Sequence, residues 1–168
     1  MITNRALGGL AEGEWGQVET LLLSVFGASR LGEFENVVCF WRGEKVVGCV
    51  GLNTVRCVGL NTGLNRLCLN QLCVEEGQVS RLCLNQLCVE EGHRNRGVAS
   101  SILEFVSRWY PQDLILYVDK HREGTDYLLE FYCARGFRVL FTSHVEFLLG
   151  RDQMAATNLS NSLHVCSS

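Results

Sequence analysis

One short segment of the sequence carries the residue types needed to hold a phosphate group. Residues 94–99 (RNRGVA) lie between an apolar, strand-like run and a stretch with helical spacing of apolar residues. A helix N-terminus presents backbone N–H groups without intrahelical partners and about half a positive charge, so it attracts anions. Gly97 and Ala99 are small enough for a diphosphate to approach the backbone, and Arg94 and Arg96 add positive charge. The turn is therefore predicted to bind a phosphorylated ligand, with an ordinary solvated turn as the alternative.

Other phosphate-binding motifs fit these residues less well. Gly92 and Gly97 have the spacing of the two P-loop glycines, but Val98-Ala99 stands where that motif requires Lys followed by Ser or Thr. The dinucleotide fingerprint G-x-G-x-x-G is absent from the sequence. A nucleotide-phosphate enzyme is therefore disfavoured.

The elements on either side of the turn would position it. Val98–Tyr110 has apolar residues at helical spacing and is followed by Pro111, which cannot continue a helix. Leu114–Val118 is a continuous apolar run, typical of a strand buried on both faces. Together with the apolar run before the turn, this predicts a strand–turn–helix unit followed by a buried strand.

Two segments are repeated without a substitution. CVGLNT occupies 49–54 and 57–62, and RLCLNQLCVEEG occupies 66–77 and 81–92, so the duplicated stretch runs through 48–92. Two identical strands compete for one place in a sheet because they offer the same pattern of side chains. Since only the second RLCLNQLCVEEG copy continues into the phosphate-binding turn, we expect that copy to hold the place.

The flanking sequence predicts further helices and strands. A helix is expected over Glu12–Phe26, ended by Gly27, and a β-hairpin over Asn36–Trp41 and Lys45–Leu52 with its turn at Gly43.

The C-terminal half adds one helix and two strands. Thr125 is expected to cap a helix that runs to Arg135 and stops at Gly136. Strands are expected over Phe137–Phe141 and Val145–Leu149. The order of elements predicts an α/β (α+β) fold, a mixed sheet with helices on its faces, in one domain over 1–150 with 151–168 as a flexible tail.

Composition narrows the class of protein. The chain has 168 residues, of which 47% are hydrophobic and 20% charged, with a net charge of −3 that gives no general attraction to nucleic acid. No apolar run reaches the ~20 residues needed to span a bilayer. The nine cysteines are an odd number, and many lie in apolar runs, such as Cys39, Cys49, Cys57 and Cys88, so we expect free, buried thiols in a cytoplasmic protein.

Two motifs resemble the GCN5-related N-acetyltransferase (GNAT) family. Arg94-x-x-Gly97-x-Ala99 matches the family's Q/R-x-x-G-x-G/A signature and follows an L-x-V strand. Residues 131–137 (FYCARGF) resemble the family's LYekxGF segment. The resemblance covers residues 10–149 and implies a mostly antiparallel central sheet flanked by helices, with splayed fourth and fifth strands.

The resemblance also implies direct transfer of an acyl group, acetyl by default, from acyl-CoA to a primary amine, with no metal. The pantetheine arm and the oxyanion would meet the backbone of Leu87, Cys88 and Val89. The pyrophosphate would meet Arg94, Asn95, Arg96, Gly97, Val98 and Ala99. Tyr132 stands where the family places the residue that donates a proton to the leaving sulfur, although an ordinary aromatic residue of the core would have the same pattern. Thr125 stands where the family commonly has an Asn near CoA.

The sequence departs from the family pattern at the residue that would act as the general base. Asn85 stands where many members carry a glutamate that deprotonates the amine, and Asp119, His121 and Glu123 are alternative bases. Asn85 and the duplication also favour a second hypothesis, a catalytically impaired acyl-CoA-binding or partner-binding module. The identity of the acceptor, a small-molecule or peptide amine, stays open. Formation of a homodimer through the last strands stays open as well.

Overall fold

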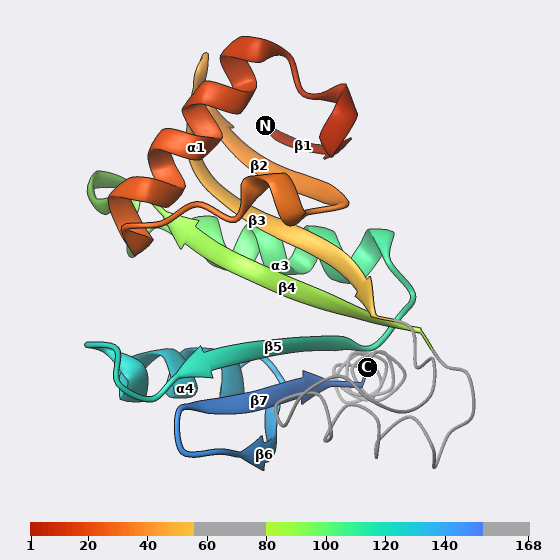
Figure 1. Ribbon diagram of the computed structural model, residues 1–168, viewed down its shortest axis with the longest axis vertical. Helices are drawn as coiled ribbons and strands as arrows, with labels where there is room; N and C mark the ends of the chain where they lie inside the picture. Colours follow the sequence, from red (N-terminus) through yellow and green to blue (C-terminus); the bar gives the residue numbers. More distant parts are fainter. Residues whose placement is uncertain (56–79, 153–168) are drawn as a thin grey trace, which may run out of the picture. The chain divides into compact units, whose positions relative to one another are not determined.

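The computed structural model describes residues 1–55 and 80–152, which form both strands and helices (Figure 1). In chain order they are β1 (Ile2–Ala6), η1 (Leu7–Gly9), α1 (Glu12–Phe26), η2 (Leu31–Glu33), β2 (Asn36–Arg42), β3 (Lys45–Val55), β4 (Arg81–Val89), η3 (Glu91–His93), α3 (Val98–Trp109), β5 (Leu114–Asp119), α4 (Thr125–Cys133), β6 (Arg138–Thr142) and β7 (Glu146–Arg151). These elements form a mixed α/β fold, as predicted.

The chain divides into two compact units. The first unit comprises Met1–Asn53 and Leu84–Pro111, and the second contains the described residues of 54–83 and 112–152. The unit boundaries cut through β3 and β4, so the last residues of β3 and the first residues of β4 are grouped with the second unit.

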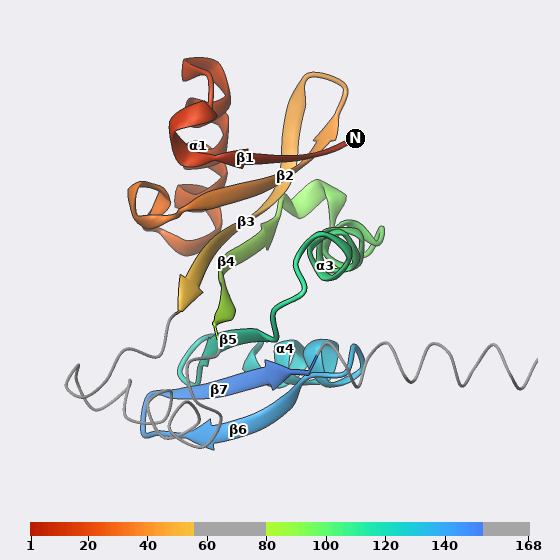
Figure 2. The ribbon, with the colours of Figure 1, turned by 90° about the vertical axis from the view of Figure 1, so that its right-hand side faces the viewer.

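A four-stranded sheet between two helices makes up the first unit. Its strand order is β1-β2-β3-β4, with β1–β2 and β2–β3 antiparallel. Figure 2 shows α1 on one face of this sheet and α3 on the other. The core under α1 joins Val18 and Leu22 of the helix to Val37, Cys39 and Cys49 of the strands.

The first helix and the hairpin confirm the predictions closely. Helix α1 spans Glu12–Phe26, and Gly27 takes a left-handed φ of 69° at its end. The carboxylate of Glu14 accepts the N–H of Ala11 at 2.9 Å, which satisfies one donor at the start of the helix. The hairpin turns at Gly43, where φ is 59°, and β3 runs on to Val55 instead of ending at Leu52.

Strand β1 is an element that the sequence pattern does not reveal. Its five residues, ITNRA, are mixed in polarity, and three of them are exposed. The strand exists because it pairs with β2 from Ile2, opposite Phe40, to Ala6, opposite Asn36. The indole N–H of Trp41 also donates to Thr3 Oγ1 at 2.8 Å. A long-range pairing, rather than local propensity, therefore forms this strand.

The second copy of the repeated segment forms β4, as expected. Residues 81–89 neighbour β3 in the sheet, and the N–H of Glu90 donates to the carbonyl of Val47 at 2.8 Å. The first copy, 66–77, lies outside the described residues, which exclude 56–79 and residues 153–168 of the expected tail. Strand β7 continues to Arg151, one residue past the expected end of the domain.

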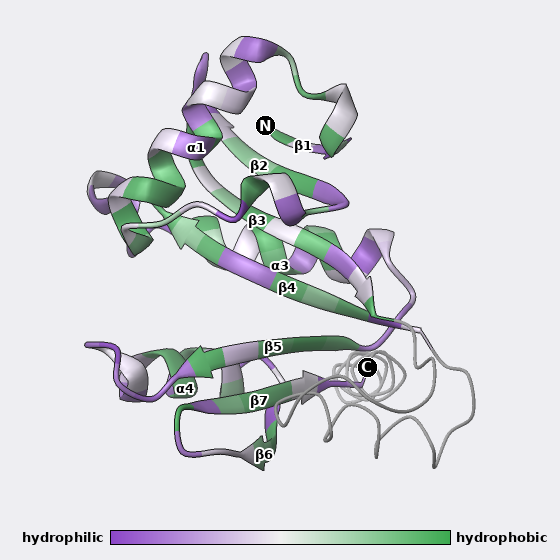
Figure 3. Ribbon diagram, in the orientation of Figure 1, coloured by the Kyte–Doolittle hydropathy of each residue, from purple (hydrophilic) through white to green (hydrophobic). Residues whose placement is uncertain are grey.

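The second unit is built on a three-stranded sheet. Its order is β5-β7-β6, and both pairings are antiparallel. Four of the six residues of β5 are buried, which confirms the prediction of a strand covered on both faces. Figure 3 shows that β5 is hydrophobic along most of its length. Ile115 of β5 packs with Leu148 of β7 and Cys83 of β4, and α4 lies against β5.

The prediction that Thr125 caps α4 is wrong. The cap is Gly124, with a left-handed φ of 82°, and Thr125 is the first residue of the helix. Its hydroxyl points back to the preceding loop, donating toward the carbonyls of Asp119 at 2.7 Å and Arg122 at 2.6 Å. A glycine adopts a left-handed φ at no steric cost, so Gly124 occupies the N-cap position. The hydroxyl of Thr125 bonds to the preceding loop instead.

Within the described residues the cysteines are free. Cys39, Cys49, Cys83 and Cys88 are buried, as predicted, whereas Cys133 is exposed. Cys83 and Cys88 pack in two different hydrophobic clusters. Cys57 lies outside the described residues. In the described ranges, no helix is long and apolar enough to cross a membrane.

Candidate functional site

The turn between β4 and α3 reverses the chain through two left-handed residues. Asn95 has a φ of 60° and Gly97 a φ of 78°, and α3 begins at Val98. The first intrahelical bond runs from the N–H of Ser101 to the carbonyl of Gly97 at 2.9 Å. The N–H groups of Val98 and Ala99 therefore precede the hydrogen-bond ladder of the helix, at the end where its dipole is positive.

The two arginines of the turn have different surroundings. Both are exposed, together with Asn95 and Gly97. The Nε of Arg94 donates to the carbonyl of Val89 at 3.2 Å, so this side chain is held against the end of β4. Two cationic side chains and a helix N-terminus at one exposed turn form an arrangement suited to a doubly charged anion.

A charge network stabilises the beginning of the turn. The carboxylate of Glu90 accepts a hydrogen bond from Nζ of Lys45, and Nδ1 of His93 lies 2.9 Å from Glu90 Oε2. The hydrogen bond from Lys45 holds the pKa of Glu90 below its usual value. The charge of Lys45 and the contact with His93 act more weakly in the same direction. Glu90 directly follows β4, and the ammonium group of Lys45 balances its negative charge.

Close packing against β3 sets the position of the first turn of α3. Gly48 of β3 has no side chain, and a Cβ built there would lie 2.7 Å from Cγ1 of Val98 and 3.2 Å from Cδ1 of Ile102. The same Cβ would lie 3.3 Å from the carbonyl oxygen of Cys88. The glycine therefore allows the helix that starts at the anion-binding turn to approach the sheet.

The residues just before the turn offer backbone rather than side chains. Cys88 is buried, with its sulfur 3.6 Å from that of Cys49, while Leu87 and Val89 are partly buried. The hydrogen bond with Cys88 and burial raise the pKa of Cys49, and burial raises the pKa of Cys39 to about 12. Because the side chain of Cys88 is buried, Cys88 is suited to contact a ligand through its main chain alone.

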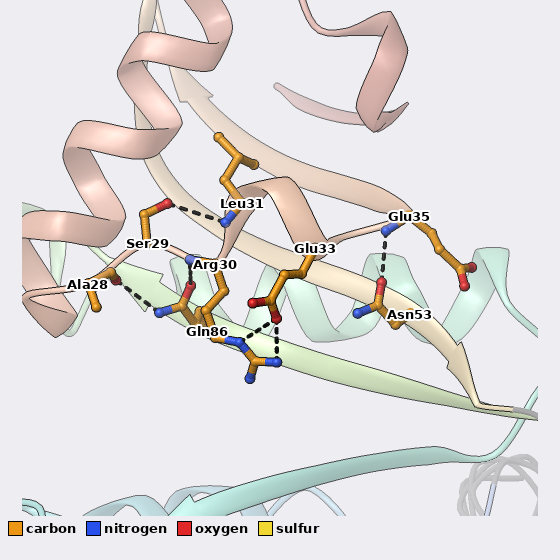
Figure 4. A network of polar contacts seen from close by, with 8 residues as sticks. All are labelled: Ala28, Ser29, Arg30, Leu31, Glu33, Glu35, Asn53 and Gln86. Carbon is orange, nitrogen blue, oxygen red and sulfur yellow. Dashed lines mark hydrogen bonds and ion pairs between the residues drawn. The ribbon is translucent and has the colours of Figure 1, made fainter.

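The middle of β4 is irregular. Gln86 takes a left-handed φ of 50°, unusual for a residue with a side chain and most unusual inside a strand. Figure 3 shows a hydrophilic interruption in the otherwise apolar β4, where Asn85 and Gln86 stand in the sequence. Figure 4 shows the amide of Gln86 between Ala28 and Arg30 of the loop that follows α1. Asn85, at the position of the missing glutamate, is an amide and cannot take a proton.

Tyr132 lies in α4 of the second unit and is almost completely buried. Its ring meets Phe131 edge-on at 5.2 Å and Phe137 at 5.5 Å between centroids. Burial raises the pKa of Tyr132 to about 12, and the positive charge of Arg122 opposes this more weakly. The phenol is therefore protonated at neutral pH, the state required of a proton donor.

Thr125 lines a hollow beside the start of α4. The hollow has a volume of about 530 Å³ and is lined by Lys120, Arg122, Gly124, Thr125, Asp126 and Phe147. The ammonium of Lys120 lies 4.8 Å from the centre of the Phe147 ring and also donates to the carbonyl of Ser143. Two cations and one acid give the hollow a net positive lining.

A pair of carboxylates lies at one end of the second sheet. Asp119 of β5 stands opposite Glu146 of β7 in the strand register. Burial, and secondly the Asp119 charge, raise the pKa of Glu146. Asp119 Oδ1 accepts the N–H of His121 at 2.8 Å, while the side chains of His121 and Glu123 are exposed. Glu146 was not among the sequence candidates because only strand pairing reveals its neighbour.

The structure brings the predicted residues together in two groups. Leu87–Val89 and residues 94–99 lie at one strand–turn–helix of the first unit. Thr125 and Tyr132 lie on α4 of the second unit. Sequence reasoning missed Gly48 and Gln86, and only for Gln86 was there any signal, a pair of polar residues inside an apolar strand.

Comparisons with known proteins agree with this geometry. The family model described as "Acetyltransferase (GNAT) family" matches residues 13–137. No curated protein matches the sequence.

Solved structures of low sequence identity share the fold. One is an acyl-CoA N-acyltransferase from Pseudomonas aeruginosa, with 13% identity, a TM-score of 0.60, and coverage of 90% of this chain and 98% of that one. Another is NAA60 of Arabidopsis thaliana in complex with acetyl-CoA, with 16% identity, a TM-score of 0.63, and coverage of 89% and 97%. A third is an aminoglycoside 6'-N-acetyltransferase complexed with coenzyme A, with 11% identity, a TM-score of 0.65, and coverage of 89% and 96%.

The family model spans well over half of the sequence and includes the turn, both its flanking elements and the segment around Tyr132. This chain belongs to the acetyltransferase (GNAT) family.

Proposed function

We propose that this protein is an N-acetyltransferase that moves an acetyl group from acetyl-CoA directly to a primary amine. Family membership supports acyl transfer from CoA to an amine. The observation that carries the proposal is the exposed turn at 94–99, where two left-handed residues present the N-terminus of α3 beside two arginines. A pyrophosphate is the part of acetyl-CoA that such a turn would bind.

The comparisons support acyl-CoA as the donor. The neighbour NAA60 was solved with acetyl-CoA and the aminoglycoside acetyltransferase with coenzyme A. In this chain, the amides of residues 94–99 would take the pyrophosphate, and the backbone of Leu87–Val89 would accompany the pantetheine arm. We also place Thr125 in contact with CoA, because it lines the hollow at the start of α4.

The reaction needs three events, which we assign as follows. The amine nitrogen attacks the thioester carbonyl, forming a C–N bond, and the carbonyl oxygen becomes an oxyanion that accepts a backbone N–H from Leu87–Val89. The C–S bond then breaks, and the thiolate takes the phenolic proton of Tyr132. The positively charged nitrogen of the tetrahedral intermediate loses a proton to solvent or to a base, which gives the neutral amide product. Solvent returns a proton to the Tyr132 phenolate, which leaves the enzyme ready for another cycle.

The base must differ from the common glutamate of the family, because Asn85 occupies that place. Asp119, at the end of β5, and His121 and Glu123, which follow it, are the candidates that we propose for this role. An amine that reaches the site already neutral would need no base at all.

The acceptor is proposed as a small molecule or peptide that carries a free amine. One neighbour, NAA60, was solved with a bisubstrate analogue, and another, Naa50, with an analogue whose peptide part is MVNAL. These neighbours support a peptide acceptor as one class to test, and the aminoglycoside enzyme supports small polyamines as another.

The experiment measures binding and turnover together. Acetyl-CoA should raise the melting temperature and ATP should not, since only a ligand that binds the folded state stabilises it. CoA release should then be followed with peptides, aminoglycosides and polyamines as acceptors. Arg94→Ala and Arg96→Ala should weaken acetyl-CoA binding, whereas Arg108→Ala, in the last turn of α3, is the matched control. No melting shift with acetyl-CoA would refute the proposal.

A further inference from the structure

Glu90, the residue that directly follows β4, has partners from two other elements. Its Oε1 accepts a hydrogen bond from Nζ of Lys45 at the start of β3, and Nδ1 of His93 in η3 lies 2.9 Å from its Oε2. The backbone of Glu90 is held as well, because its N–H donates to the carbonyl of Val47 at 2.8 Å. Both oxygens of this carboxylate therefore have a partner at the end of β4.

The guanidinium of Arg94 lies beside the same stretch of backbone. Its Nε donates at 3.2 Å to the carbonyl of Val89, which belongs to the peptide bond between Val89 and Glu90. A guanidinium has several N–H donors, so this bond leaves others for a ligand. Among residues 1–55 and 80–152 the structure gives Arg94 no carboxylate partner. The arginine thus lies next to an acid with which it does not pair.

Glu90 and an anionic ligand would compete for Arg94. The planar fork of a guanidinium binds a carboxylate or a phosphate in the same bidentate geometry, so it can serve only one of them at a time. The hydrogen bond from Lys45 holds the pKa of Glu90 below its usual value, so the acid is ionised at neutral pH. Whether Arg94 can bind a ligand therefore depends on what else the Glu90 carboxylate binds.

We propose that Lys45 is a positioning residue that occupies the Glu90 carboxylate and so leaves Arg94 to bind the pyrophosphate of acyl-CoA. This role rests on the proposed function, which places the pyrophosphate at the 94–99 turn. His93 occupies the second oxygen of Glu90, but it adds positive charge only when it is protonated. The balance of charge is therefore assigned to Lys45.

The exposure of the ion pair separates this role from a structural one. The side chain of Lys45 is 62% exposed and that of Glu90 is 31% exposed, and pairs this accessible to water contribute little to stability. A structural role predicts the same result whichever partner is removed. The proposed role predicts different results, because the acid competes for Arg94 whereas the lysine prevents that competition.

The experiment measures acetyl-CoA binding by calorimetry in Lys45→Met, Glu90→Gln and the double variant. Lys45→Met leaves the carboxylate to Arg94, so the Kd should rise at least about threefold. Glu90→Gln removes the competitor, so the Kd should fall or stay within about twofold of the wild type. The double variant should behave like Glu90→Gln. If Glu90→Gln weakens binding as much as Lys45→Met does, the ion pair is structural and the proposal is wrong.

Glu91 provides a matched control for this rescue. It is exposed, lies one residue closer to the turn, and its carbonyl accepts the N–H of Arg94 at 3.3 Å. Glu91→Gln changes the net charge by the same amount as Glu90→Gln. Lys45→Met combined with Glu91→Gln should nevertheless bind as weakly as Lys45→Met alone. Equal rescue by the two acids would mean that only the net charge near the turn matters, and would overturn the assignment to Glu90.

A second cycle asks whether Arg94 is the residue that Lys45 protects. Arg94→Ala should weaken acetyl-CoA binding in the wild type, but it should change the Kd of Lys45→Met by no more than about twofold. The reason is that Glu90 already engages Arg94 in that variant. If the two changes multiply fully, Lys45 acts independently of Arg94 and the proposal fails.

NMR titration of the Glu90 carboxyl tests the competition without a ligand. The pKa of Glu90 should be lowest in the wild type, should rise partly in Lys45→Met because Arg94 replaces the lysine, and should rise further when Arg94→Ala is added. A pKa in Lys45→Met that Arg94→Ala does not move would refute the competition. If the titrations follow this order but the wild type does not bind acetyl-CoA, the proposed function fails, and with it the role of Lys45 in binding.

Discussion

Replacing Gly48 by alanine tests whether the packing of α3 sets the anion site. The new Cβ would lie 2.7 Å from Cγ1 of Val98, the first residue of the helix, and 3.2 Å from Cδ1 of Ile102. Valine has one strongly preferred rotamer in a helix, so its side chain cannot turn away cheaply. To regain ordinary contact at 3.4 Å, the start of α3 must move by about 0.7 Å.

The structure sets the size of the effect. Overpacking of this kind costs about 1–3 kcal/mol of unfolding free energy. Hydrogen bonds to charged groups contribute about 1.5–3 kcal/mol each, and a shift of this size is enough to lose one amide–phosphate bond. The Kd for acetyl-CoA should therefore rise about 10- to 100-fold, since about 1.4 kcal/mol corresponds to a factor of ten.

The assay pairs calorimetric binding with urea unfolding, and Gly51→Ala is the control. A Cβ at Gly51 would lie 2.3–2.4 Å from three ring atoms of Phe34, so the same strand is overpacked at a residue that does not touch α3. Gly51→Ala should destabilise the fold at least as much as Gly48→Ala, yet leave the Kd of the folded protein within about twofold.

A double variant then checks the cause. Val98→Ala removes the methyl group that clashes, so Gly48→Ala combined with Val98→Ala should bind acetyl-CoA more tightly than Gly48→Ala alone, with a coupling of at least about 0.5 kcal/mol. The reasoning fails if Gly48→Ala destabilises the protein but binds acetyl-CoA normally. It also fails if Gly51→Ala weakens binding to the same degree.

Three further changes have defined outcomes. Tyr132→Phe keeps the ring contacts, so kcat should fall about 10²- to 10⁴-fold with little change in stability or in acetyl-CoA affinity; an unchanged kcat would exclude the phenol as proton donor. Because burial raises the pKa of Glu146, the folded chain keeps that proton to higher pH than the unfolded chain, and stability falls as pH rises from the usual pKa through the raised one. Glu146→Gln should therefore be more stable than the wild type above that range and equal to it below, as measured by unfolding across pH; no difference at neutral pH would contradict this. Deletion of residues 66–80 should leave the acetyl-CoA Kd unchanged, because 81–89 forms β4, and a folded deletion variant that no longer binds would overturn that assignment.

Local patterns were enough to predict most elements, because those elements have strong local signals. The apolar spacing of α1 and its glycine stop, the two β-branched arms of the hairpin, and the continuous apolar run of β5 all matched the structure within a few residues. Strand β1 had no such signal, since its exposed polar residues are held by pairing with β2.

The corner before α4 shows why a correct motif can still mislead. Thr125 is a good capping residue by type, but Gly124 takes the left-handed corner and the threonine hydroxyl bonds backward to Asp119 and Arg122 instead. Which residue caps depends on the path of the chain out of β5, and that path is set by the packing of α4 against the strand.

By itself, the sequence determined the strand–turn–helix with its small residues and arginines, and through it the family, because phosphate binding at a helix start depends on residues adjacent in the chain. Only the tertiary structure decided where that helix lies and what holds the strand before it. Gly48 meets Val98 across 50 positions of sequence, and Gln86 meets Arg30 across 56. Contacts of that kind depend on three-dimensional proximity, which no local pattern of residue types encodes.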